Sequence, residues 1–464
     1  VVGAATGMLA ALLPALLCAY MGAGFFAALR VARVARGNLL GLCSGRATGN
    51  TPALTDWLHT VLQELSGKPL DAPLTFCDLH EAPRYAGEPL SARAINLQVI
   101  TTSVSHREPR TLPFAHAHFW FQREEFDALF PKVVVDWLVQ RAGTPVHDDG
   151  RAYYRLPPGE HLPVLVATRM SLSFPLLISA VPLHEPRGPV RAPQHTVQAP
   201  EHDVSASTEG LTTGGEAESL HACSFQRCWF TDGGVASNFP IHLFDEPLPK
   251  WPTFAINLAY PKDDRPPAVD EATRIEESIF IAAENNQGWQ RSWNGFGKRI
   301  AALELAGFLF AIIATMQNWR DLLLSRAPGQ RDRIVHIALD GDEGGMNLDM
   351  PQEILSRLAA KGEAAGERLQ AQFDFRNHYW IRWRNLASAY QRSVLKVAEA
   401  THPEYQVEAY ADVYRLARDP AVVPPSYPFT SQDKRQQAAA LLELLIEQGA
   451  QWEDLGPDLT AGAP

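Results

Sequence analysis

The chain has 464 residues, 46% hydrophobic and 20% charged, so it can bury a large core and is not a disordered chain. Its 41 Lys and Arg residues against 52 Asp and Glu residues give a net charge of −11, which argues against a broad nucleic-acid interface. The five cysteines are scattered without a C-x-x-C pair, so the sequence indicates neither a disulfide framework nor a zinc knuckle.

The opening of the chain is apolar. Residues 1–29 carry no charged side chain, and Arg30, Arg33 and Arg36 follow. This run is long enough to cross about 30 Å of hydrocarbon, and its basic flank suits the cytoplasmic side. Pro14 and several glycines interrupt the run, and a buried helix followed by a second one would give the same pattern. We expect residues 1–36 to associate with a membrane. Because the chain begins at a valine, we also expect it to be a fragment.

The next part of the chain mixes helical and strand patterns. Apolar spacing predicts a helix from Pro52 to Ser66 with Thr51 or Thr55 as its cap, and another helix over 130–141. Strands are predicted in four short apolar or alternating segments, at 94–102, 118–121, 229–231 and 253–258. Together these elements predict an α/β fold with a mostly parallel sheet flanked by helices.

The remaining segments complete the predicted organisation. Residues 185–219 lack apolar periodicity and are interpreted as a mobile surface insertion within a core of residues 37–260. Residues 261–464 are predicted to be mostly helical, with one strand at 333–339. The expected helices of this portion are 300–324, 352–373, 380–400 and 436–448.

The most informative motif is a buried strand that leads directly into Asp232, Gly233 and Gly234. Catalytic groups gather at the carboxyl ends of strands in open α/β sheets, and glycines permit close approach of the backbone or positive φ. Asp232 is therefore placed to act as a base, with the two glycines supporting the site. A plain Asp-Gly turn is the alternative interpretation of this motif taken alone.

Two further motifs accompany Asp232-Gly233-Gly234. Ala167-Thr168-Arg169-Met170-Ser171-Leu172-Ser173-Phe174-Pro175 precedes it and Asn238-Phe239-Pro240 follows it. Together they resemble the patatin-like phospholipase family, and shorter segments at 41–45, 54–58 and 344–348 look like a longer bacterial branch of that family. The resemblance implies a Ser–Asp dyad that cleaves lipid esters without a cofactor, with Asp232 as the base and a serine in a G-x-S-x-G elbow. It also implies a glycine-rich loop that stabilises the oxyanion.

The nucleophile departs from the family pattern, because the chain contains no G-x-S-x-G. Gly3-Ala4-Ala5-Thr6-Gly7 has the outline of an elbow with Ala5 in the serine position, alongside Gly3 and Gly7. The other interpretation, which we favour, places the elbow and the oxyanion loop upstream of Val1. The sequence thus predicts a lipid acyl hydrolase at the cytoplasmic face of a membrane. The alternative is an inactive lipid-binding or scaffold protein in which Ala5 has replaced the nucleophile.

Weaker candidates receive structural interpretations. Cys43, within Gly41-Leu42-Cys43-Ser44-Gly45, is expected in a structural loop rather than a nucleophile elbow, and Ser171 and Ser173 are expected to cap or pack. Arg169 is expected to form a structural ion pair rather than to bind a lipid phosphate.

Two segments have partial metal-binding patterns. His116 and His118 form an H-x-H without an evident third ligand. Asp340-Gly341-Asp342-Glu343-Gly344-Gly345 resembles a calcium loop but has Pro351 where the twelfth-position glutamate belongs, so we expect it to cap the next helix. We therefore predict no metal and no cofactor.

Overall fold

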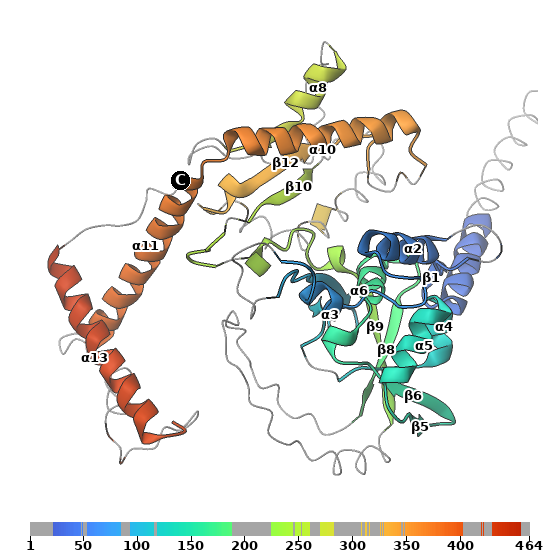
Figure 1. The fold of residues 1–464 in the computed structure, drawn as a ribbon, viewed down its shortest axis with the longest axis horizontal. Helices are drawn as coiled ribbons and strands as arrows, with labels where there is room; N and C mark the ends of the chain where they lie inside the picture. The colour runs from blue at the N-terminus through green and yellow to red at the C-terminus, as the bar shows by residue number, and fades with distance from the viewer. Residues whose placement is uncertain are drawn as a thin grey trace, which may run out of the picture. The chain divides into compact units, whose positions relative to one another are not determined.

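The computed structural model describes most of the two predicted regions after residue 36 (Figure 1). The described residues are 22–47, 49, 53–84, 93–115, 118–187, 224–244, 246–251, 253–259, 270–282, 308, 311–312, 315, 325, 327, 329–344, 347, 349–401, 419, 421 and 429–455. The chain divides into two compact units: Val1–Pro240 with Ala314–Asn318, and Ile241–Ile313 with Trp319–Pro464. Most of the predicted insertion and most of the predicted helix 300–324 lie outside the described residues.

The first unit is built on a seven-stranded sheet in which every described pairing is antiparallel. In spatial order its strands are β3 (Glu108–Leu112), β2 (Val99–Ser103), β9 (Phe225–Asp232), β8 (Val181–Pro186), β4 (Trp120–Phe121), β6 (Arg151–Arg155) and β5 (Val146–Asp148). The strand that carries Asp232 is therefore central, between β2 and β8.

The mixed α/β class is confirmed. The prediction of a mostly parallel sheet does not hold for the described strands of the large sheet. Parallel pairs occur between β1 (Gly41–Cys43) and β7 (Leu176–Ile178), and again in the second unit. Antiparallel neighbours need only short connections. The β2–β3 hairpin has such a turn at residues 104–107, and the β5–β6 hairpin has one at 149–150.

Helices pack on this sheet and contribute many of its core residues. They are α2 (Leu54–Ser66), α3 (Phe76–His80), α4 (Arg123–Asp127), α5 (Lys132–Arg141) and α6 (Val164–Ser171), and residues 22–37 form a further helix. Phe126 of α4, Val135 of α5 and Val166 of α6 are fully buried with Phe230 of β9. Burial of apolar surface on this scale is the main stabilising contribution to such a unit.

The predicted helix at 52–66 is confirmed, with a correction at its start. It ends at Gly67, whose φ of 68° is the left-handed conformation that glycine adopts at helix ends. Its N-cap is Ala53, whereas Thr55 lies inside the first turn with its hydroxyl buried and, among the residues described, without a hydrogen-bond partner. The Thr55 backbone N–H instead donates to Gly45 O at 2.9 Å.

The second unit contains a small sheet and long helices, which confirms the predicted helical C-terminal portion. Its sheet has the order β10 (Ala255–Ala259), β12 (Ile334–Ala338) and β11 (Ile279–Ile281), with a parallel first pair and an antiparallel second pair. The helices whose bounds the structure describes in this unit are α8 (Glu271–Glu277), α10 (Gln352–Gln372), α11 (Phe375–Thr401) and α13 (Gln432–Leu455).

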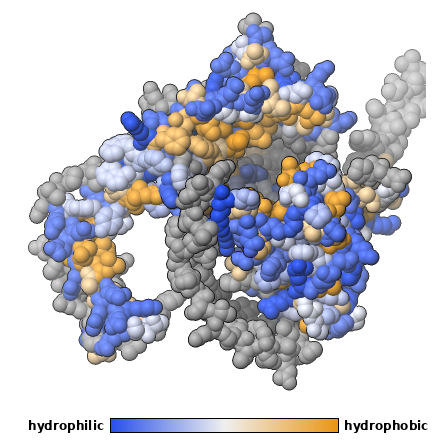
Figure 2. Space-filling view, in the orientation of Figure 1, coloured by the Kyte–Doolittle hydropathy of each residue, from blue (hydrophilic) through white to orange (hydrophobic). Residues whose placement is uncertain are grey.

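Helix α10 lies along this small sheet, where Ala365 is buried against Val335 and Ile337 of β12 (Figure 1). Ile256 and Leu258 of β10 are in register with those two β12 residues and so belong to the same face, yet both remain exposed. Figure 2 shows apolar side chains gathered in this region. Helix α10 therefore covers β11 and β12 but leaves this face of β10 exposed.

The helices of the described residues are too short or too polar to cross a bilayer. Residues 1–21, which form most of the predicted apolar segment, lie outside the described part of the chain.

Candidate functional site

The carboxylate of Asp232 stands at the end of β9, where the strand turns into the 3-10 helix η2 (Gly233–Val235). Asp232 pairs with Thr101 of β2 across the sheet. Its Oδ1 accepts a 2.6 Å hydrogen bond from the Gly234 N–H, so the side chain caps the turn that follows it. This bond fixes the carboxylate at the strand end and leaves Oδ2 for another partner.

Close approach, and not positive φ, explains both glycines: Gly233 meets backbone that cannot move aside, and Gly234 meets the ends of side chains. A Cβ on Gly233 would lie 2.8 Å from the carbonyl carbon of Ile100 and closer still to its oxygen. A Cβ on Gly234 would lie 2.5 Å from Asn238 Oδ1 and 2.9 Å from Asp232 Oδ1. The turn thus packs against the backbone of β2 on one side and against its own polar side chains on the other.

The end of α6 is tied directly to the end of β9. The carbonyl oxygen of Ser173 accepts the Asp232 N–H at 3.0 Å and the Thr231 hydroxyl at 2.6 Å. The Thr101 hydroxyl donates to Thr231 O at 2.8 Å. The segments 167–175 and 232–234, on which the family resemblance depends, therefore meet in space, although about 60 residues separate them.

The surroundings of Asp232 change its acidity. Burial raises the pKa of its carboxyl, and the hydrogen bond from Gly234 only partly opposes this effect. Among the described residues, the side chain forms no ion pair. A carboxylate with a raised pKa and little water around it accepts a proton more readily than an exposed one, which is what a general base requires.

Arg169 is fully buried beneath this site, and its partners differ from those predicted. Nη1 donates to the Ser173 hydroxyl at 2.5 Å, and Nη2 donates to the carbonyl oxygens of Ser44 at 2.9 Å and Ser179 at 3.0 Å. The predicted ion pair is wrong for the described residues, because neutral oxygens take its place. Burial lowers the pKa of Arg169 to about 10, so the guanidinium stays charged at neutral pH.

The serines and the cysteine considered as nucleophiles serve other contacts. The Ser173 hydroxyl is buried and donates back to Arg169 O at 2.9 Å, and Ser171 lies beside Gly233. Cys43 is exposed at the end of β1, and its carbonyl oxygen accepts hydrogen bonds from the backbone and hydroxyl of Ser179. The candidate elbow residues Gly3, Ala5 and Gly7 lie outside the described residues.

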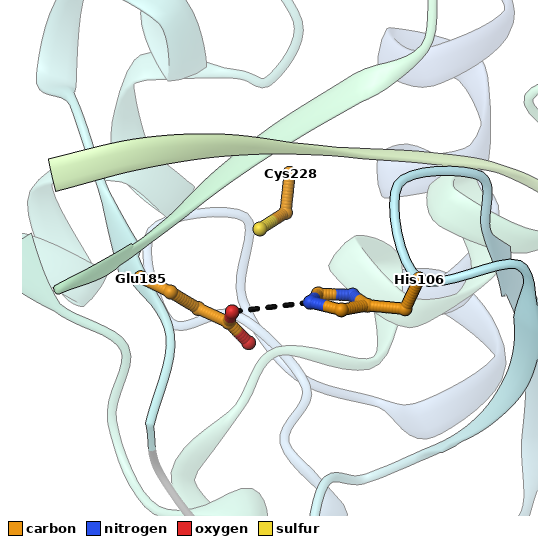
Figure 3. A group of neighbouring side chains, drawn as sticks. All are labelled: His106, Glu185 and Cys228. Atoms are coloured by element: carbon orange, nitrogen blue, oxygen red, sulfur yellow. Dashed lines mark hydrogen bonds and ion pairs between the residues drawn. The ribbon is translucent and has the colours of Figure 1, made fainter. Parts of the chain in front are cut away.

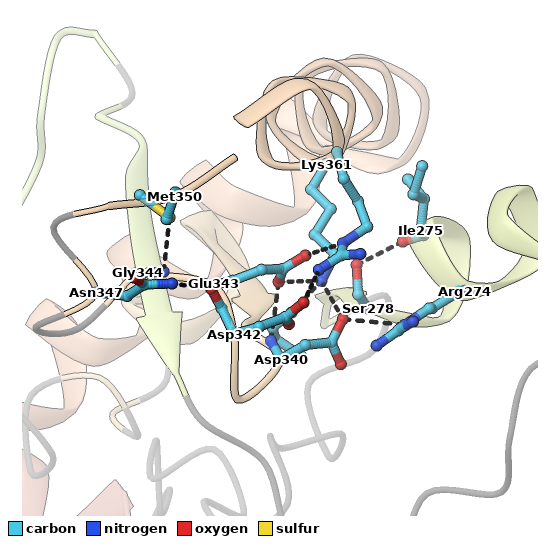
Figure 4. A network of polar contacts seen from close by, with 12 residues as sticks. Arg274, Ile275, Ser278, Asp340, Asp342, Glu343, Gly344, Asn347, Met350 and Lys361 are labelled. Atoms are coloured by element: carbon cyan, nitrogen blue, oxygen red, sulfur yellow. Dashed lines mark hydrogen bonds and ion pairs between the residues drawn. The ribbon is translucent and has the colours of Figure 1, made fainter. Parts of the chain in front are cut away.

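The acidic loop that follows β12 holds cationic side chains of α10 (Figure 4). Lys361 is fully buried, and its Nζ lies 3.0 Å from Asp340 Oδ2 and 2.5 Å from Glu343 Oε2. Arg357 pairs with Glu343 and with Asp342 at 2.5 and 2.8 Å. These amino and guanidinium groups account for the carboxylates of the calcium-like sequence. Of the H-x-H pair, His118 is exposed and His116 lies outside the described residues.

One cluster was not predicted. His106, Glu185 and Cys228 come together on the first unit, with ligand atoms all within 4.8 Å of one another. The three residues lie far apart in the sequence and in no recognisable spacing, so strand register alone unites them. No sequence signal short of the correct sheet topology would have found this group.

Comparison with known proteins places the chain by sequence. No protein-family model matches it, and no solved structure matches it significantly. The RpoH suppressor of Rhizobium meliloti (strain 1021) is 54% identical over 479 aligned residues, which cover 100% of this chain and 74% of that protein. The chain belongs to the family of the Rhizobium meliloti RpoH suppressor.

Proposed function

We propose that the chain is part of a patatin-like acyl hydrolase that cleaves carboxylic esters of lipids, with Asp232 as the general base of a Ser–Asp dyad. The serine is assigned to an elbow upstream of Val1. The observation that carries the proposal is the junction at Ser173 O, which brings together the two motifs that resemble the patatin-like family. The half-buried carboxyl of Asp232, with its raised pKa, has the chemistry of a base.

Contact with a membrane surface is the second part of the proposal. Phe25, Phe26 and Leu29 are exposed on the helix formed by residues 22–37, and Arg30 and Arg33 follow them on the same helix. Apolar side chains next to basic ones suit the boundary between acyl chains and anionic headgroups. We place this contact on the cytoplasmic side.

The second candidate function keeps the lipid contact and omits the catalysis. The exposed apolar and basic side chains of residues 22–37 favour a lipid-binding or scaffold role equally, with Ala5 at the position of a lost nucleophile. The name of the Rhizobium relative refers to suppression of RpoH and to no reaction. The two candidates differ in one feature, which is a reactive serine.

The test is labelling of the full-length protein with a fluorophosphonate, followed by peptide mass mapping and by hydrolysis of p-nitrophenyl acyl esters. An adduct on a serine upstream of Val1 is expected. Asp232→Asn should lower kcat about 100- to 10,000-fold, because a general base contributes that much. The fold should persist, since the asparagine oxygen still accepts the Gly234 N–H.

The matched control is Asp148→Asn, on β5, whose carboxylate binds the first residue of β9 at the opposite end from Asp232. Asp148 Oδ2 accepts the Phe225 N–H at 2.9 Å, so both carboxylates cap a strand end through a backbone amide. Only the Asp232 variant should lose labelling and turnover. Equal activity of the two variants would refute the role of Asp232, and absence of any adduct would favour the scaffold function.

A further inference from the structure

The cluster of His106, Glu185 and Cys228 lies where the β2–β3 turn meets the β8–β9 pair (Figure 3). Leu183 pairs with Cys228 and Glu185 with Gln226, so Glu185 and Cys228 are diagonal neighbours on one face of the two strands. His106 reaches them from the turn at residues 104–107. Figure 3 shows the three side chains pointing toward one another.

The turn that presents His106 is held firmly. The Val104 N–H donates to Trp229 O at 2.9 Å, and the Trp229 N–H donates to Ser105 Oγ at 2.9 Å. These two bonds attach the turn to β9. The imidazole is therefore positioned by the sheet itself, as a preorganised ligand requires.

The imidazole is also oriented by a residue outside the cluster. His106 Nδ1 lies 2.7 Å from the hydroxyl of Ser103, which is fully buried on β2. This contact directs Nε2 toward Glu185, whose Oε2 is 3.1 Å away. Fixing one ring nitrogen so that the other faces the ligand site is the arrangement found around metal-bound histidines.

The three side chains of the cluster differ in their exposure to solvent. Cys228 is almost completely buried, whereas the side chains of His106 and Glu185 are 26% and 20% exposed. The sulfur thus lies at the bottom of the group and the other two ligands lie at its rim. Burial and the neighbouring Glu185 carboxylate raise the pKa of the Cys228 thiol to about 12, and the charge of Arg110 only partly opposes this effect, so a cation must displace the thiol proton to gain the sulfur as a ligand.

We infer that His106 Nε2, a carboxylate oxygen of Glu185 and Cys228 Sγ form a binding site for a divalent zinc-like cation, with a water as the fourth ligand. Zinc binds nitrogen, oxygen and thiolate ligands at about 2.0–2.3 Å in a tetrahedron, which places the ligands about 3.3–3.7 Å apart. The His106–Glu185 separation of 3.1 Å is already close to that edge. The sulfur needs only a short movement, because it lies within 4.8 Å of both partners.

A thiolate, an imidazole and one carboxylate favour zinc over calcium or magnesium, which prefer oxygen ligands alone. Binding would release the thiol proton to solvent and would join the β2–β3 turn to β8 and β9. Asp232 follows Cys228 by four residues on β9, about 13 Å along the strand. The proposed ion is therefore a structural clamp at a distance from the ester-cleaving site.

The test uses the full-length protein, loaded with zinc, dialysed and measured by atomic mass spectrometry. About one zinc per chain is expected beyond the content of Cys228→Ser, and a chelator competition should show at least a tenfold loss of affinity in Glu185→Gln. Substitution of cobalt for zinc should give a thiolate-to-cobalt charge-transfer band that depends on Cys228. Ser103→Ala should weaken binding about 10- to 100-fold, as removal of an outer-shell partner does.

Cys77→Ser is the matched control. Cys77 Sγ lies 3.6 Å from Glu81 Oε1, a thiol–carboxylate pair in which no described imidazole takes part, so its loss should leave zinc content unchanged. Circular dichroism checks the fold of the buried-site variant, and Glu185→Gln, at a part-exposed position, provides an isosteric second variant. Equal zinc content in wild type, Cys228→Ser and Glu185→Gln would overturn the inference, as would a cobalt spectrum without thiolate character.

Discussion

Replacement of Gly233 by alanine tests whether close packing positions Asp232. The added Cβ would lie 2.8 Å from Ile100 C, whereas ordinary carbon contacts are about 3.5–4.0 Å. The obstacle is backbone of β2, which no rotamer change can remove. The turn must therefore move by about 1 Å relative to the sheet.

Two magnitudes follow from this displacement. Overpacking at a buried position costs about 1–3 kcal/mol of stability. A catalytic group misplaced by about 1 Å loses about 100-fold in rate. We expect Gly233→Ala to unfold at lower urea concentration than wild type and to hydrolyse p-nitrophenyl esters about 100-fold more slowly, with the loss in kcat.

Gly362→Ala is the control for the same chemical change. Gly362 lies inside α10 with no heavy atom within 4 Å of its would-be Cβ, so alanine should stabilise the protein by about 0.5–1 kcal/mol and leave hydrolysis unchanged. A Gly233→Ala protein with wild-type stability and turnover would refute the argument. Lower stability with unchanged turnover would show that the turn does not position the base.

The remaining predictions concern buried ionisable side chains in the second unit. Lys361→Met removes a cation from the buried Glu343, whose pKa burial would raise but whose hydrogen bonds from the Asp340 N–H, Lys361 and Arg357 lower. Urea unfolding of this variant should show a loss of about 3–5 kcal/mol in the free energy of unfolding at pH values where glutamate is ionised, and the loss should diminish as the pH falls and Glu343 is protonated. The control Lys396→Met, at an exposed position, should change the free energy of unfolding by under about 0.5 kcal/mol. Equal effects of the two substitutions would contradict this prediction. Burial lowers the pKa of His336 from 6.5 to about 4, so the unfolded chain takes up a proton first as pH falls through this window. The free energy of unfolding should fall by up to about 3 kcal/mol between those two pH values. His336→Gln should remove this part of the pH dependence in thermal unfolding. A variant with the wild-type pH profile would exclude His336 as the source of the pH dependence.

Patterns within short stretches of the sequence correctly predicted several helices and the strand that ends at Asp232. The helix ending at Gly67 and the long helices α10 and α11 follow from apolar spacing and a left-handed glycine, and each occurs close to its predicted range. The strand running into Asp232 likewise ends where the glycine pair begins. Close approach of the backbone, one of the two roles expected of those glycines, is the one found.

Long-range features were the ones that the sequence left open or misrepresented. The antiparallel order of the large sheet depends on pairings between distant segments, such as Ser103 with Phe230, and no local pattern encodes them. Arg169 illustrates the same limit. A buried cation on an apolar helix suggests a carboxylate partner, but converging loops can satisfy it equally well with the carbonyl oxygens of Ser44 and Ser179.

The continuous ladder between β8 and β9 has an evolutionary consequence. Its pairs run without interruption from Val181 with Phe230 to Pro186 with Phe225, and the Arg187 N–H donates to Ser224 O at 2.7 Å just beyond. The two ends of the connecting segment are therefore fixed by the strands. Insertions and deletions between residues 187 and 224 can accumulate in the family while Asp232 keeps its register.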